Sequence, residues 1–162
     1  MALKADRHEF QTDISFFYDA GAVTRGGVVC HGTAGSGAAM DQGVNLVEYV
    51  TTITNAKVPV GILLNDVVNK DLTRTHLNHF KDEVQKGGKV TLLRKGWVVT
   101  SNISGSPAAG EVAFVGDAGV IQNSAMDADG SGNLAVGRFL SSKDEDGYCK
   151  VEVNLPNHGN VS

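Results

Sequence analysis

The stretch Tyr148-Cys149-Lys150-Val151-Glu152-Val153-Asn154-Leu155 decides the fold class, because apolar and polar residues alternate more regularly here than anywhere else in the chain. Successive side chains of a β-strand point to opposite faces of a sheet. The stretch therefore predicts a strand whose buried face carries Cys149, Val151, Val153 and Leu155, and whose other face carries Tyr148, Lys150, Glu152 and Asn154. The preceding Asp146-Gly147 is a strong signal for a hairpin turn.

Similar short runs of β-forming residues, bounded by Gly, Asn, Asp or Ser, recur at 21–30, 44–54, 58–64, 89–100, 111–121 and 134–140, which predicts a series of strands joined by turns. Two of the runs resemble each other, since Val60-Gly61-Ile62-Leu63-Leu64 and Val136-Gly137-Arg138-Phe139-Leu140 both begin with Val-Gly and have a bulky residue at the fifth position. A glycine inside a strand marks a bulge or a tight corner of a barrel. The sequence thus predicts a mainly β fold, either a compact β-barrel or a β-sandwich.

Residues 70–86 are the one stretch with helical character, because Leu77, Phe80 and Val84 share one helical face and Gly87-Gly88 would end the helix. The competing interpretation is a polar excursion that lies over a neighbouring surface. We predict at most one short helix.

Aromatic residues gather near the start of the chain, where Phe10, Phe16, Phe17 and Tyr18 lie within nine residues. We interpret residues 1–20 as an N-terminal arm that docks on a partner. The alternative is a first strand or short helix that packs on the chain's own core. The division that we predict is an extended arm at 1–20, a β-rich domain at 21–156 and a loose tail at 157–162.

The composition of the chain limits the classes of function that it can have. The chain has 162 residues, 20 of them glycine, with 41% apolar residues and a formal net charge of −4, which fits one globular domain and disfavours direct binding to nucleic acid. No run of 18 apolar residues predicts a membrane helix, and the first residues do not resemble a secretory signal. We expect a product of the cytoplasm that binds neither membrane nor nucleic acid.

Motifs for chemistry are weak, so we predict neither an enzyme nor a cofactor. Gly35-Ser36-Gly37 lacks the strand and helix of a phosphate loop. Asp127, Asp129 and Ser131 resemble the start of a calcium loop, but Arg138 stands where such a loop needs a glutamate. His76 and His79 would share a helical face, which leaves a metal site as the alternative to a polar interface.

Three further residues leave alternatives open. Cys30 and Cys149 are either reduced, buried thiols or the two halves of a disulfide within or between chains. Trp97 lies in a Gly-Trp-Val-Val strand, which favours a place in the core over a role as an interface anchor.

Several segments taken together resemble structural proteins of tailed bacteriophages, in particular the head decoration or cement proteins. These segments are Met1-Ala2-Leu3-Lys4 with 6–10, 12–17, 25–29, 59–68, 81–93 and 136–148. The resemblance implies a β-rich domain that binds a capsid, often as a trimer near threefold positions of an icosahedral shell. It brings no catalytic residues with it.

We therefore expect a virion protein that binds the outside of a phage capsid, contacts the major capsid protein and assembles as a trimer. Aromatic residues of the arm would insert between capsid subunits, and a polar stretch would bridge to a neighbouring copy. The residues expected at these interfaces are Phe10, Phe16, Phe17, Tyr18, Arg74, His76, His79, Phe80 and Lys81. The alternatives are a tail tube or head–tail adaptor subunit and, further off, a small metal-binding module or enzyme.

Overall fold

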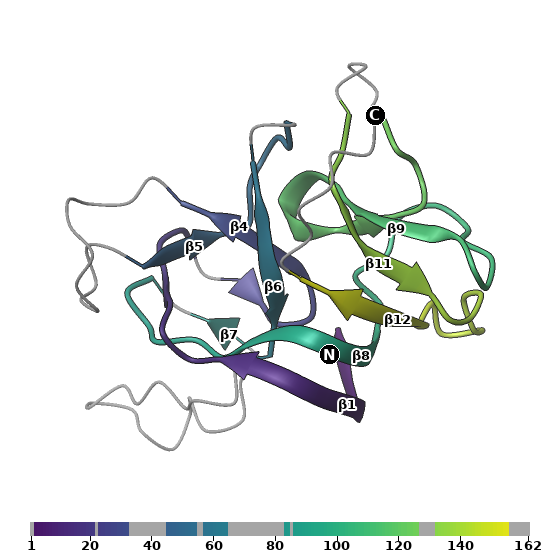
Figure 1. Ribbon diagram of the computed structural model, residues 1–162, viewed down its shortest axis with the longest axis horizontal. Helices are drawn as coiled ribbons and strands as arrows, with labels where there is room; N and C mark the ends of the chain where they lie inside the picture. Colours follow the sequence, from purple (N-terminus) through teal and green to yellow (C-terminus); the bar gives the residue numbers. More distant parts are fainter. Residues whose placement is uncertain are drawn as a thin grey trace.

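The computed structural model describes residues 2–21, 23–32, 45–54, 57–64, 83–84, 86–126 and 132–155. Twelve strands lie in these ranges, together with one short 3-10 turn, η1 (Asp117–Gly119) (Figure 1). The strands are β1 (Leu3–Asp13), β2 (Phe17–Tyr18), β3 (Val23–Thr24), β4 (Val28–His31), β5 (Leu46–Glu48), β6 (Pro59–Leu63), β7 (Glu83–Val84), β8 (Leu92–Thr100), β9 (Val112–Val115), β10 (Ile121–Gln122), β11 (Ala135–Phe139) and β12 (Cys149–Asn154).

Ten of these strands form one mixed sheet in the order β10-β9-β11-β12-β8-β6-β4-β5-β2, and β1 joins it by pairing with β8. All its pairings are antiparallel except that of β2 with β5. The two remaining strands, β3 and β7, form a separate pair. The mainly β prediction is confirmed. The barrel is not found, because the path runs from β10 to β2 without closing on itself.

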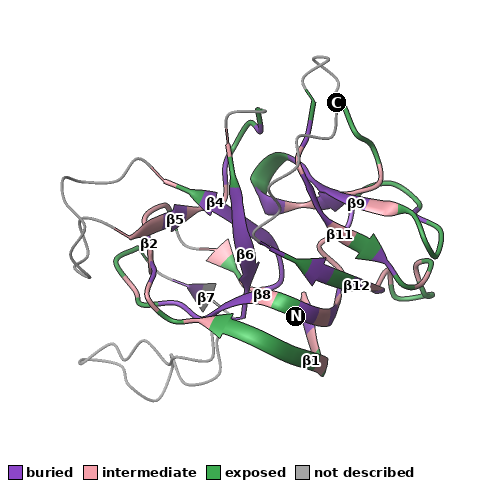
Figure 2. Cartoon of the chain, viewed as in Figure 1, coloured by how far each residue is buried: buried purple, intermediate pink, exposed green. Residues whose placement is uncertain are grey.

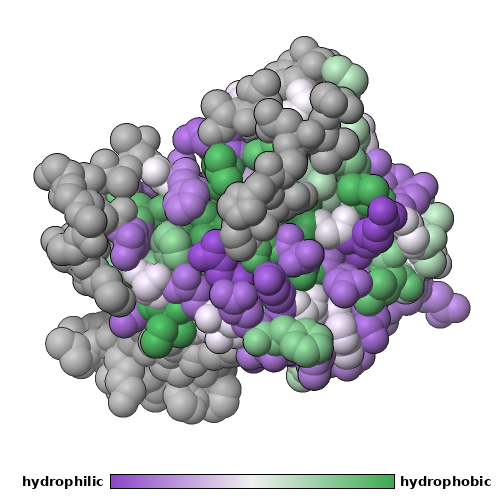
Figure 3. Space-filling model, in the orientation of Figure 1, coloured by the Kyte–Doolittle hydropathy of each residue, from purple (hydrophilic) through white to green (hydrophobic). Residues whose placement is uncertain are grey.

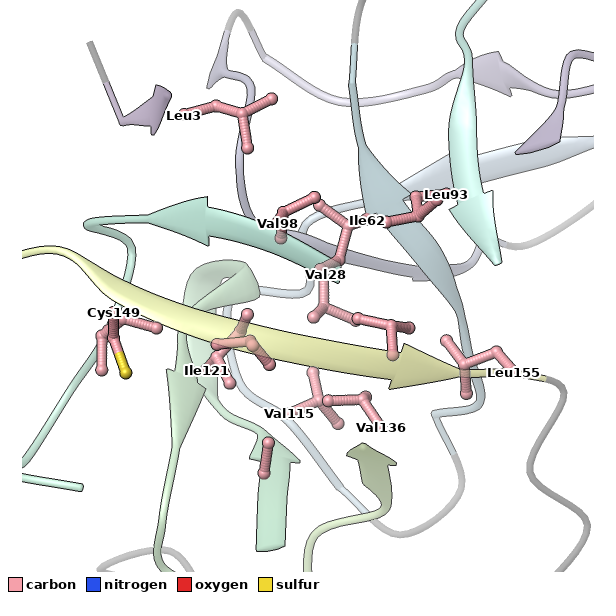
Figure 4. Packing of buried hydrophobic residues seen from close by; sticks show 14 of the residues in the cluster. Leu3, Val28, Ile62, Leu93, Val98, Val115, Ile121, Val136, Cys149 and Leu155 are labelled. Atoms are coloured by element: carbon pink, nitrogen blue, oxygen red, sulfur yellow. The ribbon is translucent and has the colours of Figure 1, made fainter. Parts of the chain in front are cut away.

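The alternation predicted for β12 is confirmed residue by residue. Cys149, Val151, Val153 and Leu155 are buried, whereas Lys150, Glu152 and Asn154 are half-buried or exposed. β12 pairs with β8 on one side and β11 on the other, so its apolar face lies over the centre of the main hydrophobic cluster (Figure 4).

β4 and β6 separate two hydrophobic clusters, and both strands are buried along nearly their whole length (Figure 2). Val28, Cys30 and Ile62 face the first cluster, whereas Val29 and Leu63 face the second. Burial on both faces explains why the sequence of β6 is a continuous apolar run rather than an alternating one.

Of the two alternatives predicted for the strand glycines, a bulge or a tight barrel corner, the structure shows a bulge beside both Gly61 and Gly137. In the pairing of β4 with β6, Val29 lies opposite Gly61 and Cys30 opposite Pro59, which leaves Val60 as the extra residue. In the pairing of β9 with β11, Ala135 and Gly137 lie opposite Phe114 and Ala113, which leaves Val136 as the extra residue. A bulge bends a strand and increases its twist, so these two places contribute to the curvature of the sheet.

Residues 92–100 form one continuous strand, β8, within the run 89–100 for which the sequence predicts strand. At Val84 the helix prediction is wrong, because Glu83–Val84 form β7 and pair with β3. Most of the stretch predicted as a helix, the residues 127–131 of the calcium-like loop and the tail at 157–162 lie outside the described residues.

The N-terminal segment belongs to the main sheet in this structure. β1 runs antiparallel to β8 along the whole length of β8, from the pair Leu3–Thr100 to the pair Asp13–Leu92. Leu3 is buried in the first cluster, while most of β1 is exposed (Figure 2). β1 is thus an edge strand whose start is anchored in the core.

Candidate functional site

Aromatic side chains gather on the outer face of the layer formed by β1, β8 and β12. The register places His8 of β1 opposite Trp97 of β8, and Trp97 opposite Glu152 of β12. We call the surface made by His8, Phe10, Trp97 and Tyr148 the aromatic face. Hydrophobic surface over β1 is surrounded there by hydrophilic residues (Figure 3).

Direct contacts join the rings of the aromatic face in sequence. Phe10 meets His8 edge to face, with 4.6 Å between ring centroids. The His8 ring stacks on Trp97 at 6.3 Å, and the Lys150 ammonium lies 3.4 Å from the Trp97 ring centroid. These contacts hold the rings in a fixed arrangement, because aromatic pairs and cation–π contacts each favour a particular geometry.

A second cation–π contact lies at the other end of the face. The Lys4 ammonium is 4.1 Å from the centroid of the Tyr148 ring and 3.5 Å from a carboxylate oxygen of Asp144. Lys4 therefore ties the start of β1 to the turn that precedes β12.

Phe10 is the most exposed large apolar side chain in the described part of the chain, with 79% of its surface accessible. It owes this exposure to a bulge: Glu9 lies opposite Gly96 and Gln11 opposite Lys95, so Phe10 has no cross-strand partner. A phenyl ring without a neighbour across the strand is free to contact another molecule.

Charged side chains of both signs surround the aromatic face. Asp6, Lys95 and Glu152 are exposed there, whereas the ion pair of Arg7 with Glu9 projects from the other face of β1, on the side of Val98. An aromatic centre with a mixed polar rim is the composition of a protein–protein contact, whereas a surface that binds nucleic acid is strongly basic.

The other aromatic residues of the predicted arm take different positions. Phe16 and Tyr18 are buried in the second hydrophobic cluster, and Phe17 is half-buried. Phe10 is therefore exposed to a partner, whereas Phe16 and Tyr18 are not. The remaining residues predicted at the interfaces lie outside the described residues, and they are Arg74, His76, His79, Phe80 and Lys81.

Cys30 and Cys149 are both free and buried. Burial raises the pKa of the Cys30 thiol to about 12 and also raises the pKa of Cys149. Two strands, β8 and β6, lie between β12 and β4 in the sheet. In this structure the two cysteines act as small apolar residues of the first cluster.

The expectation of a core position for Trp97 is wrong. Its neighbour Val98 points into the first cluster, so Trp97 points to the outer face and is half-buried by His8 and Lys150. Sequence reasoning also passed over His8 and gave no role to Tyr148 and Lys150. The signal that could have found these last two was the alternation of 148–155, which already placed them on the outer face.

Within the described ranges, no group of three or more His, Cys, Asp or Glu side chains is arranged to hold a metal ion. The same ranges contain no helix that is long and apolar enough to span a membrane.

The chain matches the family model of the structural cement proteins (E217 gp24/Pam3 gp6) over residues 9–154. Because the match spans most of the sequence, from within β1 to the end of β12, the chain belongs to this family of phage structural proteins. It is a cement protein that binds the capsid. The family match supports this role over that of a tail tube subunit, a head–tail adaptor or a metal-binding module. No match was found to a curated protein.

Proposed function

We propose that this cement protein covers the exterior of the phage capsid as a homotrimer and contacts the major capsid protein through the aromatic face, with no enzymatic activity. The observation that carries the proposal is Phe10, a phenyl ring with 79% of its surface accessible that lies at the end of the row of rings, next to His8. Exposed aromatic residues of this kind are the usual anchors of protein interfaces.

The energetics of one contact are modest. Full burial of a side chain such as phenylalanine contributes about 1.5–3 kcal/mol. A trimer that contacts a lattice at three places gains affinity through effective concentration, without new contacts. Weak individual contacts thus suffice to hold a cement protein on its shell.

The charge of the chain supports a position outside the shell. The formal net charge is −4, and packaged DNA is a dense polyanion, so the interior of a filled capsid repels the protein. We infer that the protein is synthesised in the host cytoplasm and joins the outside of the head.

The trimer rests on the resemblance described above and on the symmetry of icosahedral shells. The stretch from Arg74 to Lys81, with His76, His79 and Phe80, is proposed to bridge to a neighbouring copy. Mass measurement of the purified protein tests the oligomer, since a trimer supports the proposal and a hexamer contradicts it.

The aromatic face is tested with capsids assembled without the cement protein. Phe10→Ala should lower binding about 30-fold, as expected for an interface anchor, when co-sedimentation is followed as a function of protein concentration. Met126→Ala is the matched control, because Met126 is also an exposed apolar residue and follows β10, outside the layer of β1, β8 and β12.

Equal binding of Phe10→Ala and the unmodified chain would remove the aromatic face from the proposal. The exterior position is tested separately with closed, DNA-filled particles. The protein should bind them to the same extent as empty shells, and binding to opened shells alone would place it inside.

A further inference from the structure

Two opposed bulges isolate Phe10 without disturbing the rest of the pairing between β1 and β8. Phe10 is the extra residue on β1, and Arg94 is the extra residue on β8 directly afterwards, since Gln11 lies opposite Lys95 and Thr12 opposite Leu93. Each bulge shifts the register by one residue, in opposite directions. The pairs from Arg7–Val98 to Glu9–Gly96 therefore share one register with the pairs Thr12–Leu93 and Asp13–Leu92.

Side-chain and backbone contacts hold β1 and β8 together on both sides of the two bulges. The Arg94 guanidinium lies 3.2 Å from a carboxylate oxygen of Asp13, and the Arg94 carbonyl accepts a hydrogen bond of 2.8 Å from the N–H of Leu155. On the other side, His8 stacks on Trp97. The distortion is thus confined to the few residues around Phe10.

Gly96 is the residue that allows β1 to approach β8 at this place. Its φ is +140°, a conformation that other residues rarely adopt. A Cβ at Gly96 would overlap the carbonyl oxygen of His8 and would lie 3.3 Å from the Cα of Glu9. Those atoms are backbone, so they yield only if β1 itself moves.

We infer that Gly96 and the paired bulges position the Phe10 ring so that it enters an apolar pocket of the capsid shell protein. This inference rests on the proposed function and adds the way in which the contact is preorganised. A side chain on a pinned strand loses less conformational freedom on binding than one on a loose arm. Gly96 is a positioning residue, because it acts through Phe10.

The first experiment compares Gly96→Ala with Gly110→Ala. Gly110 also has a positive φ, +93°, but a Cβ there would meet nothing within 4 Å, so the control carries the backbone strain without the collision. Gly96→Ala should lower capsid binding about 10-fold or more, while Gly110→Ala leaves it unchanged. Thermal unfolding of both variants establishes that they are folded.

The double variant Phe10→Ala/Gly96→Ala separates positioning from general damage. If Gly96 acts through Phe10, the double variant binds no more weakly than Phe10→Ala alone, because residues that act as a unit are not additive. Full additivity of the two losses would overturn the inference.

A second comparison leaves Gly96 in place, so it tests the inference even if Gly96→Ala does not fold. It compares Phe10→Ala with the double variant His8→Phe/Phe10→Ala. His8→Phe in the Phe10→Ala background moves the phenyl ring to a regularly paired position on the same face. The inference predicts that binding is not restored, because the ring lies away from the bulge. Recovery to within about 3-fold of the unmodified chain would show that any exposed phenyl on this face suffices.

These experiments distinguish a failure of the proposed aromatic face from a failure of the role given to Gly96 and the bulges. Unchanged binding of Phe10→Ala removes the proposed aromatic face itself. Weak binding of Phe10→Ala combined with normal binding of Gly96→Ala removes only the role of Gly96 and of the bulges.

Discussion

Val60 and Val136 hold the same place in two bulges that lie far apart in the chain. Each is the extra residue of its strand pair, and each precedes a glycine that abuts the backbone of the next strand. A Cβ at Gly61 would lie 2.7 Å from the carbonyl oxygen of Leu93, and one at Gly137 would overlap that of Glu152. The Val-Gly pair thus combines a bulge with close approach of a neighbouring strand.

Gly61→Ala and Gly137→Ala should each destabilise the fold by about 1–3 kcal/mol, as expected when a packed interior must accept an additional group. Chemical denaturation gives the free energy of unfolding. Gly21→Ala is the control, because a Cβ at Gly21 would have nothing within 4 Å. Equal stability of all three variants would show that the strands do not approach as closely as described.

The start of the chain should behave as part of the folded domain. Leu3 is 1% exposed and lies in the first cluster, so Leu3→Ala should cost about 2–5 kcal/mol. Phe10→Ala removes an exposed ring and should leave the thermal unfolding midpoint nearly unchanged. Deletion of residues 1–18 should unfold the protein, since it also removes the buried Phe16 and Tyr18. A truncated chain of full stability would instead support a detachable arm.

Asp13 should contribute to a loss of stability in acid. Burial alone would raise the pKa of its carboxyl group, but hydrogen bonds from Ser15 and the Arg94 guanidinium hold that pKa below its usual value. A depressed folded-state pKa gives stability above the unfolded value of about 3.9, and this stability disappears as the pH falls through the folded value.

Asp13→Asn should therefore be less stable than the unmodified chain at pH 7, and the difference should shrink below about pH 4. Denaturation curves across this range give the measurement, with the exposed Asp6→Asn as the control. A difference that stays constant with pH would mean that the carboxylate charge of Asp13 does not matter.

Both cysteines should be present as thiols that react slowly. Burial raises the pKa of Cys30 to about 12, and the thiolate is the reactive form. Alkylation near pH 8 should be slow in the folded protein and should modify two thiols once the protein is unfolded without a reductant. Absence of free thiols in the unfolded chain would reveal the disulfide considered as the alternative.

The raised pKa of Cys30 also has a consequence at high pH. A thiol whose folded-state pKa exceeds the unfolded value of about 8.5 stabilises the fold fully below that pH. This contribution is lost as the pH rises towards 12. Cys30→Val should therefore reduce the loss of stability between these two pH values.

Structural features that depend on residues adjacent in the sequence could be predicted from local sequence patterns. The alternation of 148–155 fixed the two faces of β12, and the Val-Gly pairs revealed two bulges. The first follows from the alternation of side chains along a single strand, and the second from the tendency of a glycine inside a strand to mark a bulge.

Features that depend on pairing between distant strands could not be predicted from the sequence. Trp97 looks like a core residue until the bulge at Arg94 shifts the alternation of β8, which places Leu93 and Val98 in the same cluster and Trp97 outside it. Phe10 is exposed for a similar reason, because its bulge exists only in relation to Gly96. The helical spacing of Leu77, Phe80 and Val84 gives no sign of the strand at Val84, because its partner Val23 is 61 residues away in the sequence (84 − 23).

Electron microscopy of capsids with and without this protein tests the central claim most directly. We predict additional density on the outer surface of the shell, with β1, β8 and β12 facing the shell and the Phe10 ring in contact with the major capsid protein. Density in which this layer points to solvent, or which lies inside the shell, would contradict the account.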